Sequence, residues 1–306
     1  MSRLLLTAAG TGTAFSYATA VAKNFSDLEL FTADINSSEY VTASLFSKKH
    51  FRVNSIYSSN YNKEIEGIVI NNNINFYVPV LDVEFLSAFQ SDKISSVLVS
   101  NSYLFCSKCI EKSNYQVSFG DVGLALPTLI NISEVDELNN YIAKKNGGFG
   151  GRETKIIKGN EIKKLDKDYF LYEKVDGDEF TIDCFPFDGR VYTSIRRRVE
   201  VKNGVCVKAE IVQDKRLQDV ANNISNKYKL NNPFCFQVIK NNNKYYLIDV
   251  NPRLGAGSSI SSINGMDFFS AHLAVLTDKD PLKFLKKHHN GCIVTRQYAN
   301  YLMKVV

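Results

Sequence analysis

The chain has 306 residues, enough for about two domains of roughly 150 residues each. Apolar residues make up 44% and charged residues 23% of the sequence, close to globular averages, which excludes a disordered, fibrous or charge-driven chain. Thirty-seven Lys and Arg residues against 32 Asp and Glu residues leave a net charge of +5. This mild, dispersed charge does not indicate a nucleic-acid partner, but it is compatible with a local anionic ligand such as a nucleotide.

The cysteines and the apolar runs indicate a reduced, cytoplasmic protein. A chain of this length does not need disulfides, and its six cysteines are scattered. Cys106 and Cys109 have CxxC spacing, but no second pair completes a metal set, which favours two small buried residues over a metal or redox site. Gly10 to Thr13 interrupt the N-terminal apolar stretch, so it does not read as a signal peptide. No apolar run approaches the roughly 20 residues that span a bilayer, so we expect no membrane partner.

The first hundred residues predict a small α/β domain. Leu4 to Ala8 reads as a buried strand, Gly10 to Thr13 as a turn and Ser16 to Lys23 as a helix. Further strand-like runs are Leu28 to Ala33, Gly67 to Ile70 and Asn75 to Val80. In such a domain the ligand side lies at the carboxyl ends of the strands.

Gly10-x-Gly12 is only a weak sign of a dinucleotide site. The third glycine of that motif and its acidic residue about 20 positions further on are not convincingly placed. An NAD-dependent enzyme is therefore an alternative that leaves the later motifs unexplained.

After Pro127 the pattern changes to antiparallel strands. Glu179 to Phe185 alternates between its two faces, and Asp188-Gly189 and Asn203-Gly204 predict turns on either side of a strand at Val191 to Val201. Val205 to Val212 completes a three-stranded meander. Apolar residues then repeat at helical spacing, at Leu217, Val220, Ala221, Ile224 and Tyr228.

The next two strands bring polar side chains together. Phe234 to Lys240 and Lys244 to Val250 flank the turn-forming run Asn241 to Asn243. If this hairpin closes symmetrically about Asn243, Gln237 lies directly opposite Asp249, and Asn251 shares the face of Asp249. From spacing alone, a polar solvent-facing edge explains these residues equally well.

Two earlier segments, together with the end of this hairpin, favour a binding site over a solvent-facing edge. Tyr141 to Thr154 reads YIAKKNGGFGGRET, a strand ending in lysines followed by glycines whose N–H groups can cradle an anion. The acidic run Glu173 to Glu179 lies downstream, and Asp249 to Arg253 reads DVNPR near the end of the chain. A glycine-rich tip alone is unspecific, and it gains weight from the two later segments.

Taken in order, these segments resemble the ATP-grasp superfamily, closest to the carbamoyl-phosphate-synthase-like ligases. Glu111-Lys112, followed by Gly123 and Pro127, is similar to the DK segment that opens the module. The other elements and their counterparts are Lys144 to Gly151 for KPxxGxGGxG, Glu173 to Glu179 for the QEyixGxE hinge, and Gln237 with Asp249 to Arg253 for the Q…ExNPR metal-binding strands. The resemblance covers essentially the whole chain.

The resemblance implies a fold of the α/β and α+β classes. A small Rossmann-like, pre-ATP-grasp domain would span residues 1–105 and an ATP-grasp domain residues 106–306. Lys112 and Lys144 would contact the ATP phosphates. The other ATP-binding residues would be those of the glycine loop and hinge: Gly148, Gly150, Gly151, Glu173, Lys174, Val175 and Glu179.

The resemblance also implies a metal site and a site for a carboxylate. Gln237, Asp249 and Asn251 would face Mg²⁺, with Mn²⁺ as an alternative; Mg²⁺ prefers a few oxygen ligands plus phosphates. Arg253, Arg198 and Arg196 would hold a carboxylate or an acyl phosphate, because a guanidinium binds such groups bidentately. An arginine run is also typical of a solvated face.

Three positions depart from the family pattern: Asp249 replaces the usual Glu, Lys145 replaces a Pro, and Glu153 replaces the last glycine of the loop. The sequence thus predicts an ATP-dependent carboxylate–amine ligase that forms a C–N bond through an acyl phosphate. The alternative is an ATP-binding sensor or assembly subunit whose chemistry has lapsed. The partners would be a small-molecule carboxylate and amine of unspecified identity, and a homodimer is a family-level expectation.

Overall fold

The computed structural model describes residues 1–147, 154–202 and 204–305, and it contains three sheets. The N-terminal part is a parallel sheet with strand order β3-β2-β1-β4. Its elements are β1 (Ser2–Leu6), α1 (Gly12–Asn24), β2 (Leu28–Asp34), β3 (Lys49–Arg52), α2 (Tyr61–Asn71) and β4 (Phe76–Val78). The predicted strand, glycine turn and helix at the start of the chain are confirmed.

The predicted strand at Gly67 to Ile70 is wrong, because these residues lie within α2. Ile65, Ile68 and Val69 are buried at helical spacing. The short apolar run is therefore one stripe of an amphipathic helix.

Short helices lead from the parallel sheet into the rest of the chain. They are α3 (Asp82–Ala88), α4 (Asp92–Ser95), α5 (Tyr103–Ile110), the 3-10 turn η3 (Lys112–Asn114) and α6 (Tyr115–Phe119). Cys106 and Cys109 are free and buried in α5, as expected for structural residues. The domain division at residue 105 stays a prediction, and that position lies inside α5.

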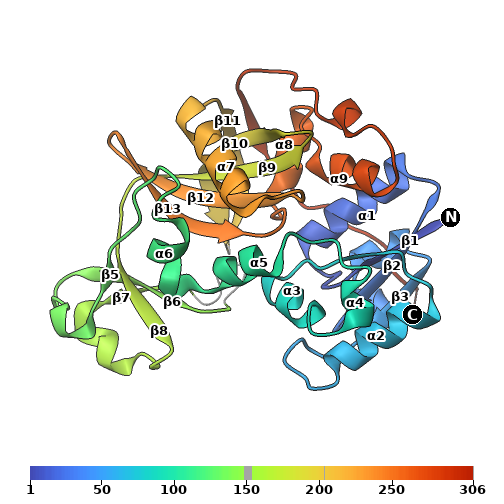
Figure 1. Cartoon of the computed structure of the whole chain (residues 1–306), viewed down its shortest axis with the longest axis horizontal. Helices are drawn as coiled ribbons and strands as arrows, with labels where there is room; N and C mark the ends of the chain where they lie inside the picture. The colour runs from blue at the N-terminus through green and yellow to red at the C-terminus, as the bar shows by residue number, and fades with distance from the viewer. Residues whose placement is uncertain (148–153, 203, 306) are drawn as a thin grey trace.

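Two antiparallel sheets follow, and Figure 1 shows the smaller one as a separate lobe. It has strand order β5-β8-β6-β7, from β5 (Leu129–Ile130), β6 (Asn140–Lys145), β7 (Thr154–Lys158) and β8 (Tyr169–Glu173). The larger has order β13-β12-β9-β10-β11-β14. Its strands are β9 (Asp178–Phe187), β10 (Arg190–Lys202), β11 (Val205–Val212), β12 (Phe234–Asn241), β13 (Lys244–Asn251) and β14 (Cys292–Thr295). The predicted change to antiparallel strands after Pro127 is confirmed.

Helices cover the larger sheet and join it to the N-terminal sheet. Helix α7 (Lys215–Tyr228) buries Leu217, Val220, Ala221 and Ile224, as its spacing predicts, in one core with residues of β9 and β12. Helices α8 (Ser258–Ile263) and α9 (Phe268–Leu276) follow β13, and α9 packs beside α1 (Figure 1). The Tyr17 and Phe269 rings meet edge to face at 4.8 Å. A continuous core thus connects the first and last parts of the chain.

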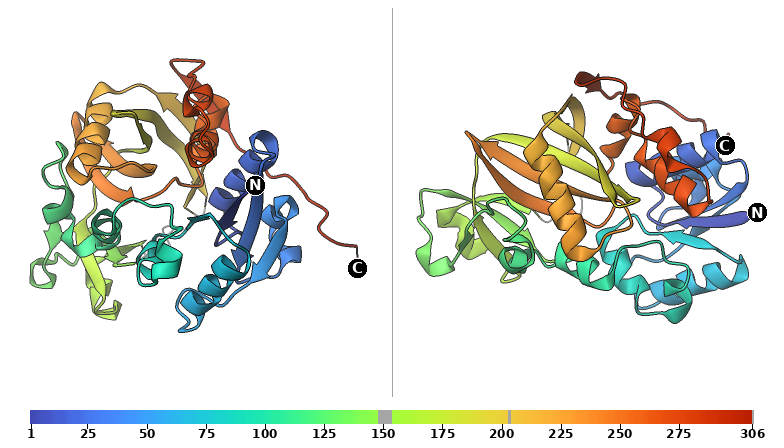
Figure 2. Two further views of the ribbon diagram at one scale, coloured as in Figure 1. Left: turned by 45° about the vertical axis from the view of Figure 1, so that its right-hand side comes forward. Right: turned by 45° about the horizontal axis from the view of Figure 1, so that its top comes forward.

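The C-terminal segment, residues 296–305, runs along the N-terminal part without regular structure (Figure 2). The Tyr301 ring contacts the Phe15 ring of α1 edge to face at 5.7 Å. Among the helices of the described residues, none combines the length and apolar character needed to cross a membrane.

Candidate functional site

The β12–β13 hairpin places Gln237 opposite Asp249, as predicted, but by a different route. Asn241 pairs with Lys244, so the turn has two residues, and Asn242 has a positive φ of 52°. The symmetric closure about Asn243 is therefore wrong. A β-bulge restores the expected pairing, because Val238 pairs with Leu247 and Gln237 with Asp249, leaving Ile248 as the extra residue.

The bulge also provides a carbonyl group for Lys144. Lys144 lies near the end of β6 in the small sheet, and its Nζ donates to the Ile248 carbonyl at 2.6 Å. Burial lowers the pKa of Lys144 to about 8, and Lys112 acts in the same direction, while Asp249 opposes them. The two sheets are thus joined by a cation whose charge depends on pH near neutrality.

Asp249, whose side chain is 26% exposed, is the centre of a network of partly buried polar groups. Lys112 forms an ion pair with its Oδ1 and donates to the Tyr115 hydroxyl at 2.7 Å. Asn251 Nδ2 donates to Asp249 Oδ2 at 2.9 Å. Burial alone would raise the pKa of Asp249, but Lys112 and Lys144 outweigh it, so the pKa lies below its usual value. The carboxylate is therefore ionised and flanked by two lysines.

The donor atoms of this network fit a hard cation such as Mg²⁺ in type. Asp249 offers a carboxylate, and Asn251 and Gln237 offer amide oxygens on the same pair of strands. Gln237 Nε2 donates to Thr181 Oγ1 at 3.4 Å, which leaves its amide oxygen free to bind an ion. Within the described ranges, no cluster of three or more His, Cys, Asp or Glu side chains forms a metal site. A metal held here would depend on ligands from outside the protein, such as phosphates.

The predicted hinge connects the two antiparallel sheets. Glu173 ends β8, and its backbone N–H donates to the Thr128 carbonyl at 2.9 Å. Lys174 forms an ion pair with Asp176. A side chain at Gly177 is excluded, because its Cβ would lie 2.1 Å from the Lys240 carbonyl oxygen. The glycine fixes the hinge against the end of β12.

The glycine loop lies almost entirely outside the described residues, and so do Gly148, Gly150, Gly151 and Glu153. Gly147 at its start has a positive φ of 74°, and its N–H donates to the Ile110 carbonyl at 3.2 Å. The loop therefore leaves β6 next to the end of α5.

The three candidate arginines have carboxylate partners within the chain. Arg196 is 2% exposed, pairs with the fully buried Asp183 and donates to Ser261 Oγ at 3.0 Å. Its guanidinium also lies beneath Gly257, whose added Cβ would be 3.0 Å from Arg196 Nη2. Burial lowers the pKa of Arg196 to about 10. These contacts place Arg196 in the interior, under the loop that follows β13.

Arg198 and Arg253, the other two candidate arginines, form ion pairs with Glu179 and Asp82. Arg198 pairs with Glu179, the candidate ribose residue, and donates to the Gly204 carbonyl at 2.9 Å. Arg253 Nε lies 2.7 Å from Asp82 Oδ1. Burial lowers the pKa of Arg253, whereas the negative charges of Asp82 and Asp249 raise it. The net shift of the pKa is upward.

Sequence reasoning missed Asp82 and Tyr115. Asp82 directly follows Pro79 to Leu81 after β4, so the rule that ligands bind at strand carboxyl ends points to it. Tyr115 lies three residues after Lys112 and gave no comparable signal. The pairing of Glu179 with Arg198 was also missed, although the sequence contains a signal for it. Counting from the two-residue Asp188-Gly189 turn places these two residues opposite each other.

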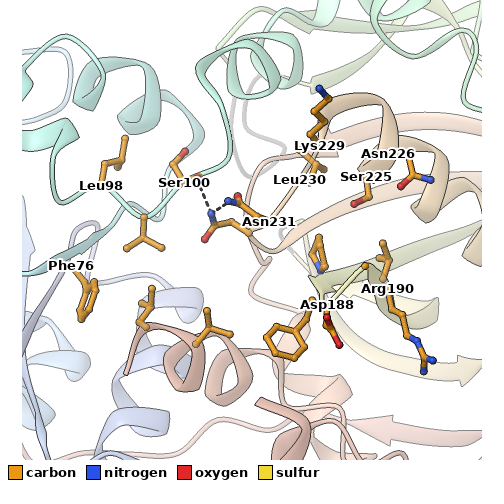
Figure 3. A pocket seen from close by; sticks show the side chains of 18 of the residues that line it. Phe76, Leu98, Ser100, Asp188, Arg190, Ser225, Asn226, Lys229, Leu230 and Asn231 are labelled. Atoms are coloured by element: carbon orange, nitrogen blue, oxygen red, sulfur yellow. Dashed lines mark hydrogen bonds between the residues drawn. The ribbon is translucent and has the colours of Figure 1, made fainter. Parts of the chain in front are cut away.

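A groove of about 1310 Å³ lies apart from this network, between the β9–β10 turn, the end of α7 and residues 96–100 (Figure 3). Lys229, Leu230 and Arg190 are among its lining residues. It shares Val99, Ser100 and Asn232 with a small cavity that reaches Arg253. Neither cavity is lined by Asp249 or Lys112.

Solved structures with low sequence identity share this fold. Carboxyaminoimidazole ribonucleotide synthase from Aspergillus clavatus, complexed with ATP, matches with a TM-score of 0.74 and 12% identity over 95% of this chain and 81% of its own. L-amino acid ligase from Bacillus licheniformis gives 0.70 and 12% over 94% and 78%. The biotin carboxylase domain of the Hydrogenobacter thermophilus 2-oxoglutarate carboxylase, in complex with MgADP, ADP and bicarbonate, gives 0.71 and 10% over 90% and 70%. The chain therefore has the ATP-grasp fold.

A model of one particular ATP-grasp family matches much of the second half of the chain. Residues 166–297 match the family described as ATP-grasp in the biosynthetic pathway with Ter operon. No curated protein sequence matches the chain. The resemblance to the ATP-grasp superfamily and the expected fold class are confirmed.

Proposed function

We propose that this chain is an ATP-dependent ligase that activates a carboxylate as an acyl phosphate and joins it to an amine, releasing ADP and phosphate. The observation that carries the proposal is the network around Asp249, where two lysines, an amide and a carboxylate meet on the strands that match the family's metal-binding elements. Electrostatic interactions with Arg253 and Asp82 connect this network to the N-terminal sheet.

The two lysines would neutralise the triphosphate. Lys112 and Lys144 enter the network from η3 and β6, and both lower the pKa of Asp249. Phosphoryl transfer spreads negative charge over the transferred group, and positioned cations stabilise that charge. Lys144 would exchange the Ile248 carbonyl for phosphate oxygens, and Lys112 would contact them from its place beside Asp249.

Gln237, Asp249 and Asn251 would hold Mg²⁺, which supplies charge neutralisation at the transferred phosphoryl group when bound. Lys112 is the present cationic partner of Asp249, so it and the metal would share this carboxylate. The shorter Asp in place of Glu suits one ion with several non-protein ligands.

The hinge residues would bind the nucleoside. Glu173, Lys174 and Val175 would hold the adenine, and Glu179 the ribose hydroxyls, while Gly148, Gly150 and Gly151 would close over the phosphates. Because Arg198 pairs with Glu179, we propose that it orients this carboxylate. Arg196 would support the loop after β13 in a similar way.

Arg253 would bind the carboxylate substrate. A carboxylate oxygen attacks the γ-phosphorus, the bond to the β–γ bridging oxygen breaks, and ADP leaves. The amine then attacks the acyl carbon, the C–O bond to phosphate breaks, and the nitrogen loses a proton. The protein's contribution is to position the reactants and stabilise charge, without a side-chain nucleophile.

Replacing Asp249 and Asn251 together by alanine tests the proposal. We expect the double variant to lose Mg²⁺-dependent ADP formation in the presence of pooled carboxylates and amines, with mass spectrometry of the products as a second readout. Asn243→Ala, at the exposed turn of the same hairpin, is the matched control and should retain activity. Unchanged turnover in the double variant contradicts the assignment. Tight ATP binding by the wild type without ADP release across the panel favours the lapsed sensor.

A further inference from the structure

Asp82 is a buried carboxylate that the N-terminal sheet brings to the candidate site. It is the first residue of α3, follows β4 closely and is 3% exposed. Glu84 fixes the preceding turn, because its carboxylate accepts the N–H groups of Val80 at 3.1 Å and Leu81 at 2.9 Å. The Tyr61 hydroxyl donates to the same carboxylate at 2.6 Å. Asp82 therefore has a fixed place from which to hold a partner.

Arg253 uses only part of its guanidinium to contact the chain. Its Nε lies 2.7 Å from Asp82 Oδ1, and Nη2 donates to Oδ2 at 3.3 Å. Nη1 donates to the Leu254 carbonyl at 3.0 Å. A guanidinium has five N–H donors. Each terminal nitrogen thus keeps one N–H without an acceptor among the residues that the structure describes.

The planarity of the guanidinium gives these contacts a directional effect. The Nη2 hydrogen bond and the close Nε–Oδ1 ion-pair contact with Asp82 fix the direction of the remaining N–H groups, because all five donors lie in one rigid plane. One free N–H on each terminal nitrogen suits a bidentate carboxylate or phosphate. The same arginine can then contact Asp82 and an external anion.

We propose that Asp82 is a positioning residue that aims Arg253 at the carboxylate substrate and its acyl phosphate. The inference rests on the proposed ligase function, and it makes the N-terminal sheet part of the reaction site. A change in how that sheet packs on the DVNPR segment would then alter the reaction through Arg253.

The local charges agree with this role. Burial raises the pKa of Asp82, whereas Arg253 and then Lys112 lower it and Asp249 raises it, with a net upward shift. For Arg253, burial lowers the pKa, and Asp82, Cys235 and Asp249 together raise it, with a net upward shift. Arg253 thus lowers the pKa of Asp82 and Asp82 raises that of Arg253, as expected for an ion pair.

The first experiment reads the orientation of Arg253 without requiring activity. Arginine-selective ¹⁵N labelling should show a slowly exchanging guanidinium N–H signal, from the Nη2 group that donates to Asp82, that disappears in Arg253→Lys. In Asp82→Asn this signal should broaden and exchange with water at least about tenfold faster, because the ionic acceptor is lost. Asp267→Asn is the matched control, since Asp267 caps α9, has no cationic partner in the described part of the chain, and Asn caps equally well. An unchanged Arg253 signal in Asp82→Asn overturns the proposal.

The second experiment separates positioning from a purely structural role. Asp82→Asn should lower carboxylate-dependent kcat/KM by roughly 10 to 100-fold, mainly through KM for the acid, with the KM for ATP unchanged. Asp82→Glu should recover part of the loss. In an Arg253→Lys background, Asp82→Asn should have little further effect; independent, multiplicative effects overturn the proposal. If the wild type forms no product, the ligase assignment fails, and the exchange measurement still decides the role of Asp82.

Discussion

Arg196, which is buried, and Arg253, which is partly buried, each face a buried aspartate, yet their surroundings differ. Arg196 and Asp183 lie on neighbouring strands of one sheet, and Ser258 and Ser261 donate to the same aspartate at 2.7 and 2.9 Å. Asp82 begins α3 and Arg253 lies in the segment after β13, and the Arg253 side chain is 15% exposed. Among the residues that the structure describes, the Nε of each arginine lacks a hydrogen-bond partner, so the two pairs differ in exposure: Arg196 is 2% exposed and enclosed by the chain, whereas part of the Arg253 side chain is open to solvent. The difference suggests that one pair stabilises the fold and the other serves a ligand.

Asp183→Ala should give the largest change in stability, because it leaves the Arg196 charge buried without its partner. Breaking a buried ion pair in this way costs about 3–5 kcal/mol. Chemical denaturation should show this loss in the free energy of unfolding. Asp178→Ala, on the same strand but at the exposed pair with Arg197, should change stability by less than about 1 kcal/mol. Equal effects of the two substitutions would remove the distinction between the buried and exposed pairs.

Arg253→Lys should instead affect activity more than stability. Lysine keeps a positive charge beside Asp82 but loses the planar donor set. We expect carboxylate-dependent kcat/KM to fall by about 10²–10³, the range found when one donor to a developing anion is removed. The free energy of unfolding should fall much less than in Asp183→Ala. A variant with full activity, or one as unstable as Asp183→Ala, would contradict the ligand-binding role.

The side-chain pairs of the large sheet can be predicted from the sequence where the position of a turn sets the register of two strands. The two-residue Asp188-Gly189 turn sets the β9–β10 register and thereby the Glu179–Arg198 pair. The Gln237–Asp249 pair was predicted from an incorrect turn, and only the bulge at Ile248 makes it correct. A bulge depends on contacts outside the hairpin, such as the Lys144 hydrogen bond, which local spacing does not encode.

The contact between Asp82 and Arg253 is less predictable, because it too depends on residues that are far apart in the sequence. The strand-end rule marks the region after β4, but it does not select Asp82, whose role depends on how the N-terminal sheet packs beside Arg253. Spacing likewise places Arg196 on one face of β10 without revealing that Asp183 binds it. Local rules predict elements and faces, while the partners of buried charges are set by tertiary packing.

The smallest effect that we expect is a pH dependence of ATP binding through Lys144. This lysine differs from both arginines because its charge titrates near neutrality. Burial lowers its pKa in the folded protein to about 8, so between that value and its usual pKa the unfolded chain binds more protons, and stability without ligand should rise with pH. ATP binding requires the charged form, so the Kd for ATP should increase by roughly tenfold from pH 7 to pH 9. Titration calorimetry at several pH values should show this slope in the wild type and in Lys145→Arg, and a flat profile in Lys144→Arg. A slope shared by all three proteins would assign the titration to another group.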